Sequence, residues 1–165
     1  LELGCGTGTT ALRLAPHVSH YVATDISSGM IAIAKEKAAQ GGAKVEFVAG
    51  TAGRMSWPAS SFDAVLAFNV LHLVPDRQAL YAEARKLLKP GGLFISKTPC
   101  LGEMNRLIRL AVPVMQAIGK APYVAFLRAP DLEQEIQAAG FTPVERARHG
   151  SSPQKDARIF LVARN

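Results

Sequence analysis

The chain has 165 residues, of which 48% are hydrophobic and 19% are charged, and its formal net charge at pH 7 is +6. This predicts one globular domain with a sizeable core, and no apolar run is long enough to span a bilayer. The basic residues are scattered with few aromatics between them, which disfavours a nucleic-acid surface. The two cysteines, Cys5 and Cys100, suit neither a disulfide framework nor a metal cluster, so we expect buried thiols in a cytoplasmic protein.

The first elements surround a glycine-rich turn. Three residues of strand character, 1–3, precede glycines at positions 4, 6 and 8, so we expect the chain to start inside a strand and to lack its N-terminal segment. A short helix ending near Pro16 and a second strand over 20–25 are predicted next. Ser27 or Ser28 would cap the following helix. Its predicted apolar face is formed by Met30, Ile31, Ile33, Ala34 and Ala38, and the glycines at 41–42 would end it.

The later elements continue the alternation of strand and helix, which favours a parallel sheet covered on both faces. The nearly continuous apolar segment 62–68 predicts a central strand. The other predicted segments are strands over 44–50 and 93–98, a helix over 77–88, a turn over 89–92, a helix over 129–140 and two closing strands within 141–150 and 157–165. A long connection, 99–130, carries apolar residues at helical spacing.

A strand, a glycine-rich turn and a helix form a common cofactor-binding arrangement. A dinucleotide fingerprint reads G-x-G-x-x-G, whereas here the spacing is G-x-G-x-G and Thr9 stands in the place of the third glycine. Asp25 ends the second predicted strand, where a carboxylate can accept hydrogen bonds from ribose hydroxyls and would repel a 2′-phosphate. A solvated surface aspartate is the alternative.

An ordered set of motifs strengthens this interpretation. "LELGCGTG", "VATDIS", "FVAGTAGRMSWPASSFDAV", "VLHLVPD", "LKPGG" and "AGF" follow one another along the chain. In this order they resemble the class I S-adenosylmethionine-dependent methyltransferases, especially the small-molecule branch with the ubiquinone and menaquinone biosynthesis enzymes. The resemblance implies an α/β, doubly wound Rossmann-like sheet of seven mostly parallel strands with an antiparallel C-terminal strand. It implies one domain over 1–165 with a lid-like helical insertion at 100–129.

The resemblance also implies which residues surround S-adenosylmethionine. The matching positions are Glu2, Gly4, Cys5 and Gly6 beside the methionine part, Asp25 at the ribose, Ile26, Thr51 and Ala52 near the adenine, and Asn69 facing the amino group. Thr51 departs from the family pattern, which usually has an acid there. A neutral hydroxyl in place of a carboxylate would weaken cofactor binding by about 1 kcal/mol or less.

Methyl transfer requires mainly that donor and acceptor are aligned and that water is excluded, so no catalytic triad is expected. His72, just past the fourth strand, is our candidate for a catalytic histidine, against a purely structural role on its loop. The insertion would cover the acceptor with apolar side chains, among them Met104, Leu107, Ile108 and Met115. Arg106 and Arg109 would meet an acidic head group or a membrane surface, against the alternative of solvated arginines on a core-facing helix.

The sequence thus predicts methyl transfer to a small, hydrophobic, quinone- or lipid-like acceptor, with no metal. Two alternatives stay open. A nicotinamide-dependent oxidoreductase would share the general fold, but the displaced third glycine disfavours it. A non-catalytic cofactor-binding or partner protein is favoured only by Thr51. The sequence does not indicate an oligomeric state.

Overall fold

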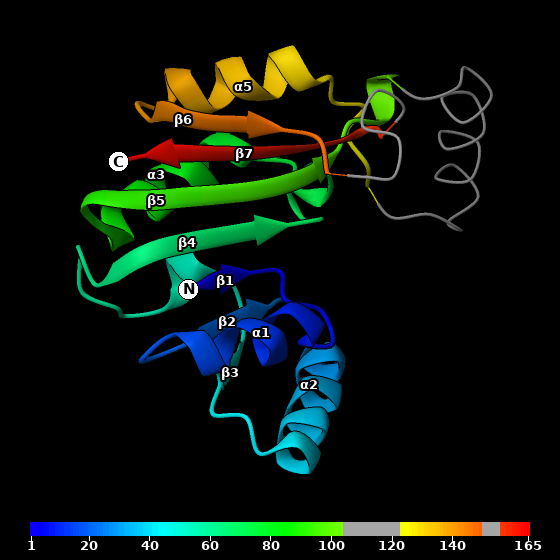
Figure 1. The fold of residues 1–165 in the computed structure, drawn as a ribbon, viewed down its shortest axis with the longest axis vertical. Coiled ribbons are helices and arrows are strands. Elements are labelled where there is room, and N and C mark those ends of the chain that lie inside the picture. The colour runs from blue at the N-terminus through cyan, green and yellow to red at the C-terminus, as the bar shows by residue number, and fades with distance from the viewer. Residues whose placement is uncertain (104–122, 150–155) are drawn as a thin grey trace.

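The structure, a computed structural model, describes residues 1–103, 123–149 and 156–165. Within these residues seven strands form one sheet in the order β3-β2-β1-β4-β5-β7-β6 (Figure 1). The strands are β1 (Glu2–Leu3), β2 (Val22–Asp25), β3 (Glu46–Ala49), β4 (Phe62–Phe68), β5 (Leu88–Pro99), β6 (Thr142–Ala147) and β7 (Arg158–Arg164). The helices are α1 (Thr9–Leu14), α2 (Ser28–Gly41), α3 (Arg77–Leu87) and α5 (Ala129–Ala138).

The strand directions match the predicted sheet. The pairs β1–β2, β2–β3, β1–β4 and β4–β5 are parallel, while β7 runs antiparallel to both β5 and β6. The nearly continuous apolar strand β4 lies in the middle, as predicted, because a strand covered on both faces exposes neither set of side chains to water. The doubly wound α/β fold with an antiparallel C-terminal strand is confirmed.

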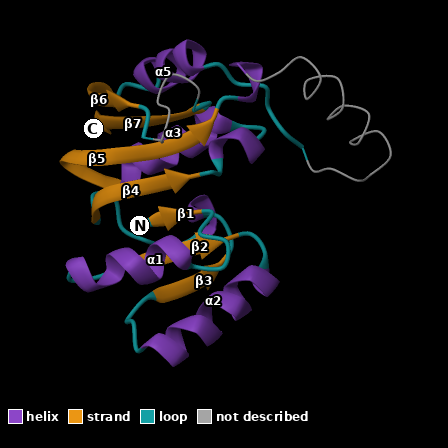
Figure 2. Cartoon of the chain, turned by 45° about the vertical axis from the view of Figure 1, so that its right-hand side comes forward, coloured by secondary structure: helices purple, strands orange, loops and turns teal. Residues whose placement is uncertain are grey.

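Two apolar layers hold the helices on the sheet. On one face, α1 and α2 pack through Ala11, Ile31 and Ala34, and on the other, α3 and α5 pack through a larger cluster that includes Tyr81 and Leu132. Figure 2 shows the sheet with helices on both sides. The larger cluster contains an aromatic series, in which Tyr81 meets Phe94 edge-on at 5.8 Å and Phe94 stacks on Phe141 at 5.1 Å between ring centroids. The core therefore fixes the strands whose ends form the site.

The ends of α2 follow the predicted local signals. The Ser27 hydroxyl accepts a hydrogen bond from the Met30 N–H at 3.3 Å, and Gly42 ends the helix in the left-handed conformation. The predicted apolar face is too wide, because Met30 and Ile33 remain 42% and 43% exposed. Only a narrow stripe of this edge helix meets the sheet, and Met30 borders a cavity instead.

The predicted turn over 89–92 is part of β5. Leu88 already pairs with Phe62, and a register shift follows before the pairing resumes at Leu93. The Gly91 N–H donates to the Asn165 carbonyl at 3.0 Å, and the Asn165 N–H donates to the Gly92 carbonyl at 2.9 Å. The glycines therefore form an irregularity within a paired strand, since the end of β7 satisfies their backbone groups.

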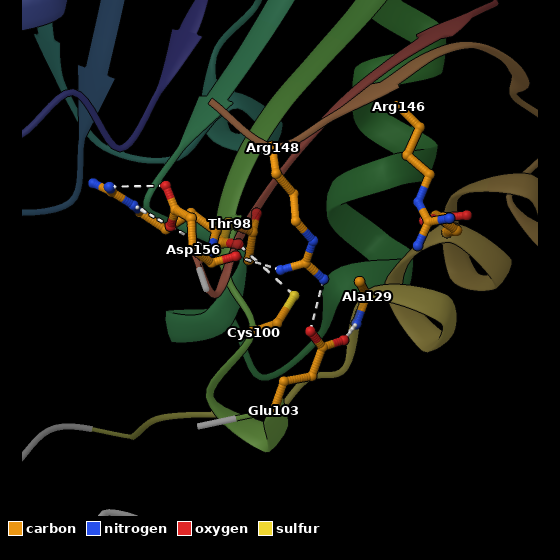
Figure 3. Close-up of polar contacts among 9 residues, drawn as sticks. Thr98, Cys100, Glu103, Ala129, Arg146, Arg148 and Asp156 are labelled. Atoms are coloured by element: carbon orange, nitrogen blue, oxygen red, sulfur yellow. Dashed lines mark hydrogen bonds and ion pairs between the residues drawn. The ribbon is translucent and has the colours of Figure 1, made fainter. Parts of the chain in front are cut away.

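Hydrogen bonds join the segment that precedes residues 104–122 to the segment that follows them. Gly102 N–H donates to the Leu127 carbonyl at 2.8 Å. Glu103 accepts one hydrogen bond from the Ala129 N–H, which begins α5, and another from the Arg148 guanidinium, both at 2.7 Å (Figure 3). The predicted lid residues Met104, Leu107, Ile108 and Met115 lie outside the described residues, as do Arg106 and Arg109.

Candidate functional site

A cavity of about 760 Å³ lies at the carboxyl ends of β1, β2, β3 and β4. Its volume is in the range of small-molecule sites, and its place is where open α/β sheets bind ligands. Segments 2–6, 24–27, 50–53 and 68–70 line it, together with residues of α1, α2 and α3 and of the loop that precedes α3.

The glycines of the first loop serve two different purposes. A Cβ on Gly4 would lie 2.5 Å from Cγ2 of Val70, so only glycine lets the first loop approach the loop that follows β4. A Cβ on Gly6 would meet nothing within 4 Å, but its φ of +53° is one that other residues rarely adopt. Gly4, with a φ of +68°, thus serves both the turn and the close packing, while Gly6 gives the backbone its turn and leaves open space beside the cavity.

The carboxylate of Asp25 is held by two backbone groups. Its Oδ2 accepts a hydrogen bond from the Gly6 N–H at 2.8 Å, and its Oδ1 accepts one from the Ser27 N–H at 2.9 Å. A carboxylate has about four acceptor sites, so each oxygen can still accept a hydrogen bond from a ligand. Asp25 therefore connects the glycine loop to the start of α2 and presents two fixed acceptors at the cavity.

All nine predicted cofactor-binding residues border this one cavity. They are Glu2, Gly4, Cys5, Gly6, Asp25, Ile26, Thr51, Ala52 and Asn69. Ile26 is 81% exposed, a large apolar surface left beside the cavity. Asn69 has a φ of +54°, the left-handed region that asparagine tolerates better than most residues. The structure brings these residues together, and their individual roles remain predictions.

His72 differs from the other predicted site residues. It lies in the 3₁₀ turn Leu71–Leu73, is partly buried and is not among the residues that line the cavity. Its carbonyl accepts a hydrogen bond from the Ala125 N–H at 2.7 Å. Its Nδ1 atom is buried without a hydrogen-bond partner among the described residues, and burial lowers the pKa of the imidazole. Its catalytic role remains a prediction.

A second wall of the cavity was missed from the sequence. It consists of Leu73, Val74, Asp76, Ala79, Leu80 and Glu83, which precede α3 or lie along it. The Asp76 carboxylate caps α3 by accepting the Ala79 N–H at 2.9 Å. An aspartate directly before an amphipathic helix is a recognisable N-cap, but the sequence gives no sign that this helix faces the cavity.

The charged residues that line the cavity are all acidic. They are Glu2, Asp25, Asp76 and Glu83, and none of the described lining residues is a lysine, arginine or histidine. Such a site favours a cationic ligand over a pyrophosphate, because the described lining supplies no positively charged side chain.

The two cysteines are buried free thiols, as predicted. Burial raises the pKa of Cys5 to about 12 and that of Cys100 to about 11, so both remain protonated at neutral pH. Among the described residues, no helix is long and apolar enough to cross a membrane.

A family model described as a methyltransferase domain matches residues 1–92. The chain therefore belongs to the methyltransferases, and its fold and glycine loop are those of the class I, S-adenosylmethionine-dependent family. Ubiquinone biosynthesis O-methyltransferase from Azorhizobium caulinodans is 30% identical over 182 residues, which cover 99% of this chain and 70% of that protein.

Demethylmenaquinone methyltransferase from Clavibacter sepedonicus is 38% identical over 96 residues, which cover 58% of this chain and 38% of that protein. Among solved structures, an S-adenosylmethionine-dependent methyltransferase from Methanosarcina mazei has a TM-score of 0.81 at 21% identity, covering 99% of this chain and 90% of that chain. At this level of identity the structural match supports the fold alone.

Proposed function

We propose that this protein transfers the methyl group of S-adenosylmethionine to a small, mainly apolar acceptor. The observation that carries the proposal is the single cavity shared by the glycine loop, Asp25 and the segments 50–53 and 68–70. This cavity combines fixed backbone geometry, a carboxylate with free acceptor sites and an apolar wall.

The residues present fit this cofactor. The two oxygens of Asp25 match two neighbouring ribose hydroxyls, and the exposed side chain of Ile26 offers an apolar surface for adenine. The acidic lining suits a ligand that carries positive charge on its sulfur and on its ammonium group. Thr51 lies on the cavity, and its hydroxyl makes no hydrogen bond with the described residues, so it can accept one from the adenine amino group.

The protein's part in the reaction is mainly positional. When bound, S-adenosylmethionine supplies a methyl group on a positively charged sulfur. The chain binds the ribose through Asp25, closes the cavity with the loop that contains Asn69 and Val70, and keeps water away with Leu73 and Leu80. Alignment of two bound reactants contributes several kcal/mol of the barrier reduction, about 7–11 in well-oriented cases.

The acceptor that this cavity favours is neutral and apolar. The α3 side offers Leu73, Val74 and Leu80, while the described lining has no cation to pair with an acidic group. A ring compound of the quinone-precursor type fits this chemistry, and relatives of this chain are named for the biosynthesis of ubiquinone and menaquinone. Contact with a membrane surface through Arg106 and Arg109 remains a prediction.

Where the acceptor is a phenol, a proton must leave during the transfer. His72 is our candidate for taking it, because burial lowers its pKa and leaves the imidazole neutral at pH 7. An imidazole that acts in this way must come within hydrogen-bond reach of the acceptor hydroxyl.

The proposal is tested by incubating the protein with methyl-labelled S-adenosylmethionine and a panel of acceptors, followed by mass spectrometry of the products. We expect label on apolar phenols and quinone precursors and slower labelling of matched compounds that carry a carboxylate. Labelling of polar peptides alone, with none on apolar small molecules, would contradict the proposed acceptor class.

A further inference from the structure

A buried hydrogen bond lies behind the glycine loop. Tyr21 Oη donates to Oε2 of Glu2 at 2.9 Å, and the two residues are only 5% and 2% exposed. Glu2 also borders the cavity. Burying a carboxylate is costly unless it is hydrogen-bonded or paired with a cation. The contacts of the Glu2 carboxylate therefore indicate which kind of group it binds.

The backbone of Glu2 is fixed on both sides. It pairs with Ala23 of β2 and with Leu66 of β4, and its carbonyl accepts a hydrogen bond from Thr24 Oγ1 at 3.2 Å. The only freedom left is in the side-chain torsions, and among the described residues only Tyr21 makes a hydrogen bond to the carboxylate. Its other oxygen, Oε1, accepts none from these residues.

In the part of the chain that the structure describes, the side chains around this carboxylate supply no positive charge at neutral pH. Burial and then the charge of Glu2 raise the pKa of Cys5 to about 12, so the thiol is neutral. Burial followed by the charge of Glu2 raises the pKa of Tyr21 far above its usual value, so its hydroxyl stays a donor. Among the described residues, Glu2 thus has one neutral donor and one oxygen without a partner.

We infer that Tyr21 is a positioning residue for ligand binding. Its hydroxyl holds Oε2 of Glu2 so that Oε1 can take a cationic group in the cavity, namely the ammonium of the amino-acid part of the cofactor. The inference rests on the proposed function, because it assigns a role within the same cavity. Tyr21 itself does not line the cavity and acts only through Glu2.

The test compares two ligands that differ in the amino-acid part. S-Adenosylhomocysteine carries the ammonium group, whereas 5′-methylthioadenosine lacks it. Both are titrated by calorimetry into the full chain, the Tyr21→Phe variant and a Tyr81→Phe control. Tyr81 is also a buried tyrosine that contacts a carboxylate, Glu135 at 3.5 Å, but it does not line the cavity.

We expect Tyr21→Phe to weaken S-adenosylhomocysteine binding about tenfold and to leave 5′-methylthioadenosine within about twofold of the unsubstituted chain. Glu2→Gln should show the same ligand-selective loss, and the double variant should be no worse than Glu2→Gln alone. Tyr81→Phe should change neither affinity.

An equal loss for both ligands in Tyr21→Phe would show a purely structural role, and no loss for either would show no role, so each result overturns the inference. Failure of the proposed function looks different, because the unsubstituted chain would then bind neither nucleoside. In that case the inference falls with it.

Discussion

The Asp25 carboxylate at the end of β2 bonds to backbone groups of neighbouring turns, whereas Arg77 of α3 pairs with a charged side chain of α5 far along the chain. Asp25 accepts from Gly6 and Ser27 on the turns that flank the cavity. Arg77, in contrast, forms a two-pronged pair with Glu135 across 58 residues, at 2.7 Å on both arms. The first region holds its shape through turn geometry, and the second through specific pairs.

This difference separates binding from stability. Substitutions at the first set of contacts should change cofactor affinity, while substitutions at the second should change the free energy of unfolding. The following variants test that separation, beginning with the largest expected effect.

Asp25→Ala removes the acceptor of two backbone N–H groups and the two fixed oxygens offered to the ribose. We expect the affinity for S-adenosylhomocysteine to fall about 100-fold, measured by calorimetry. Asp63→Ala is the control, because that carboxylate is exposed and pairs with Lys89 at 2.7 Å away from the cavity. An affinity for Asp25→Ala within about twofold of the unsubstituted chain would remove Asp25 from the site.

Arg77→Ala leaves Glu135 without its guanidinium partner where the two side chains are only 15% and 26% exposed. We expect the free energy of unfolding in urea to fall by about 2 kcal/mol, below the range for fully buried pairs because solvent still reaches this one. The affinity for S-adenosylhomocysteine should not change. Lys89→Ala, which breaks an exposed pair, is the matched control and should leave stability unchanged. A loss of affinity without a loss of stability in Arg77→Ala would show that this pair serves binding rather than stability.

Thr51→Asp restores the acid that the family usually has at this position. A carboxylate accepts a stronger hydrogen bond from an amino group than a hydroxyl does, so S-adenosylhomocysteine should bind about fivefold more tightly. Thr51→Asn supplies a neutral acceptor of nearly the same size and should bind like the unsubstituted chain. Equal affinity in all three proteins would place Thr51 outside the adenine site.

Substitution of Glu103 should have the smallest effect, a change in thermal stability that depends on pH. Burial alone would raise the pKa of Glu103, but hydrogen bonds from the Ala129 N–H and the Arg148 guanidinium outweigh it and hold the pKa below its ordinary value of 4.5. A carboxyl group whose pKa is depressed by folding stabilises the protein above that ordinary value, and the contribution is lost as pH falls through the folded-state pKa.

Glu103→Gln should therefore lower Tm by about 2 °C at pH 7 and remove part of the fall in Tm on acidification below pH 4.5. Glu145→Gln, an exposed carboxyl group on β6, is the control for the general effect of removing one charge. The same acid dependence in Glu103→Gln and in the unsubstituted chain would contradict the account of this contact.

Sequence reasoning described best those features that depend on short segments of the chain. β4 occupies residues 62–68 as predicted, and Ser27 caps α2, because apolar continuity and capping are visible in short segments. Asp25 also ends β2 as predicted, while its role in binding stays a prediction. The prediction of a turn over 89–92 was wrong, because the backbone of Asn165, at the other end of the chain, forms hydrogen bonds with this segment.

The features that sequence reasoning missed depend on contacts between residues far apart in the chain, which no short sequence pattern contains. The Tyr21–Glu2 hydrogen bond, the second cavity wall along α3 and the capping of α5 by Glu103 each require the folded arrangement. Met30 illustrates the limit, because helical spacing assigned it to the core while the narrow contact of α2 with the sheet leaves it at the cavity rim. Periodicity identifies a helix but not how wide a stripe its neighbours cover.

The most direct test of the central claim is a pair of calorimetric titrations of the full chain, one with S-adenosylhomocysteine and one with NADH. The acidic cavity and the G-x-G-x-G loop predict a dissociation constant of roughly micromolar size for the first ligand and no measurable heat of binding for the second. Binding of NADH without binding of S-adenosylhomocysteine would contradict a methyl-donor site and would favour an oxidoreductase.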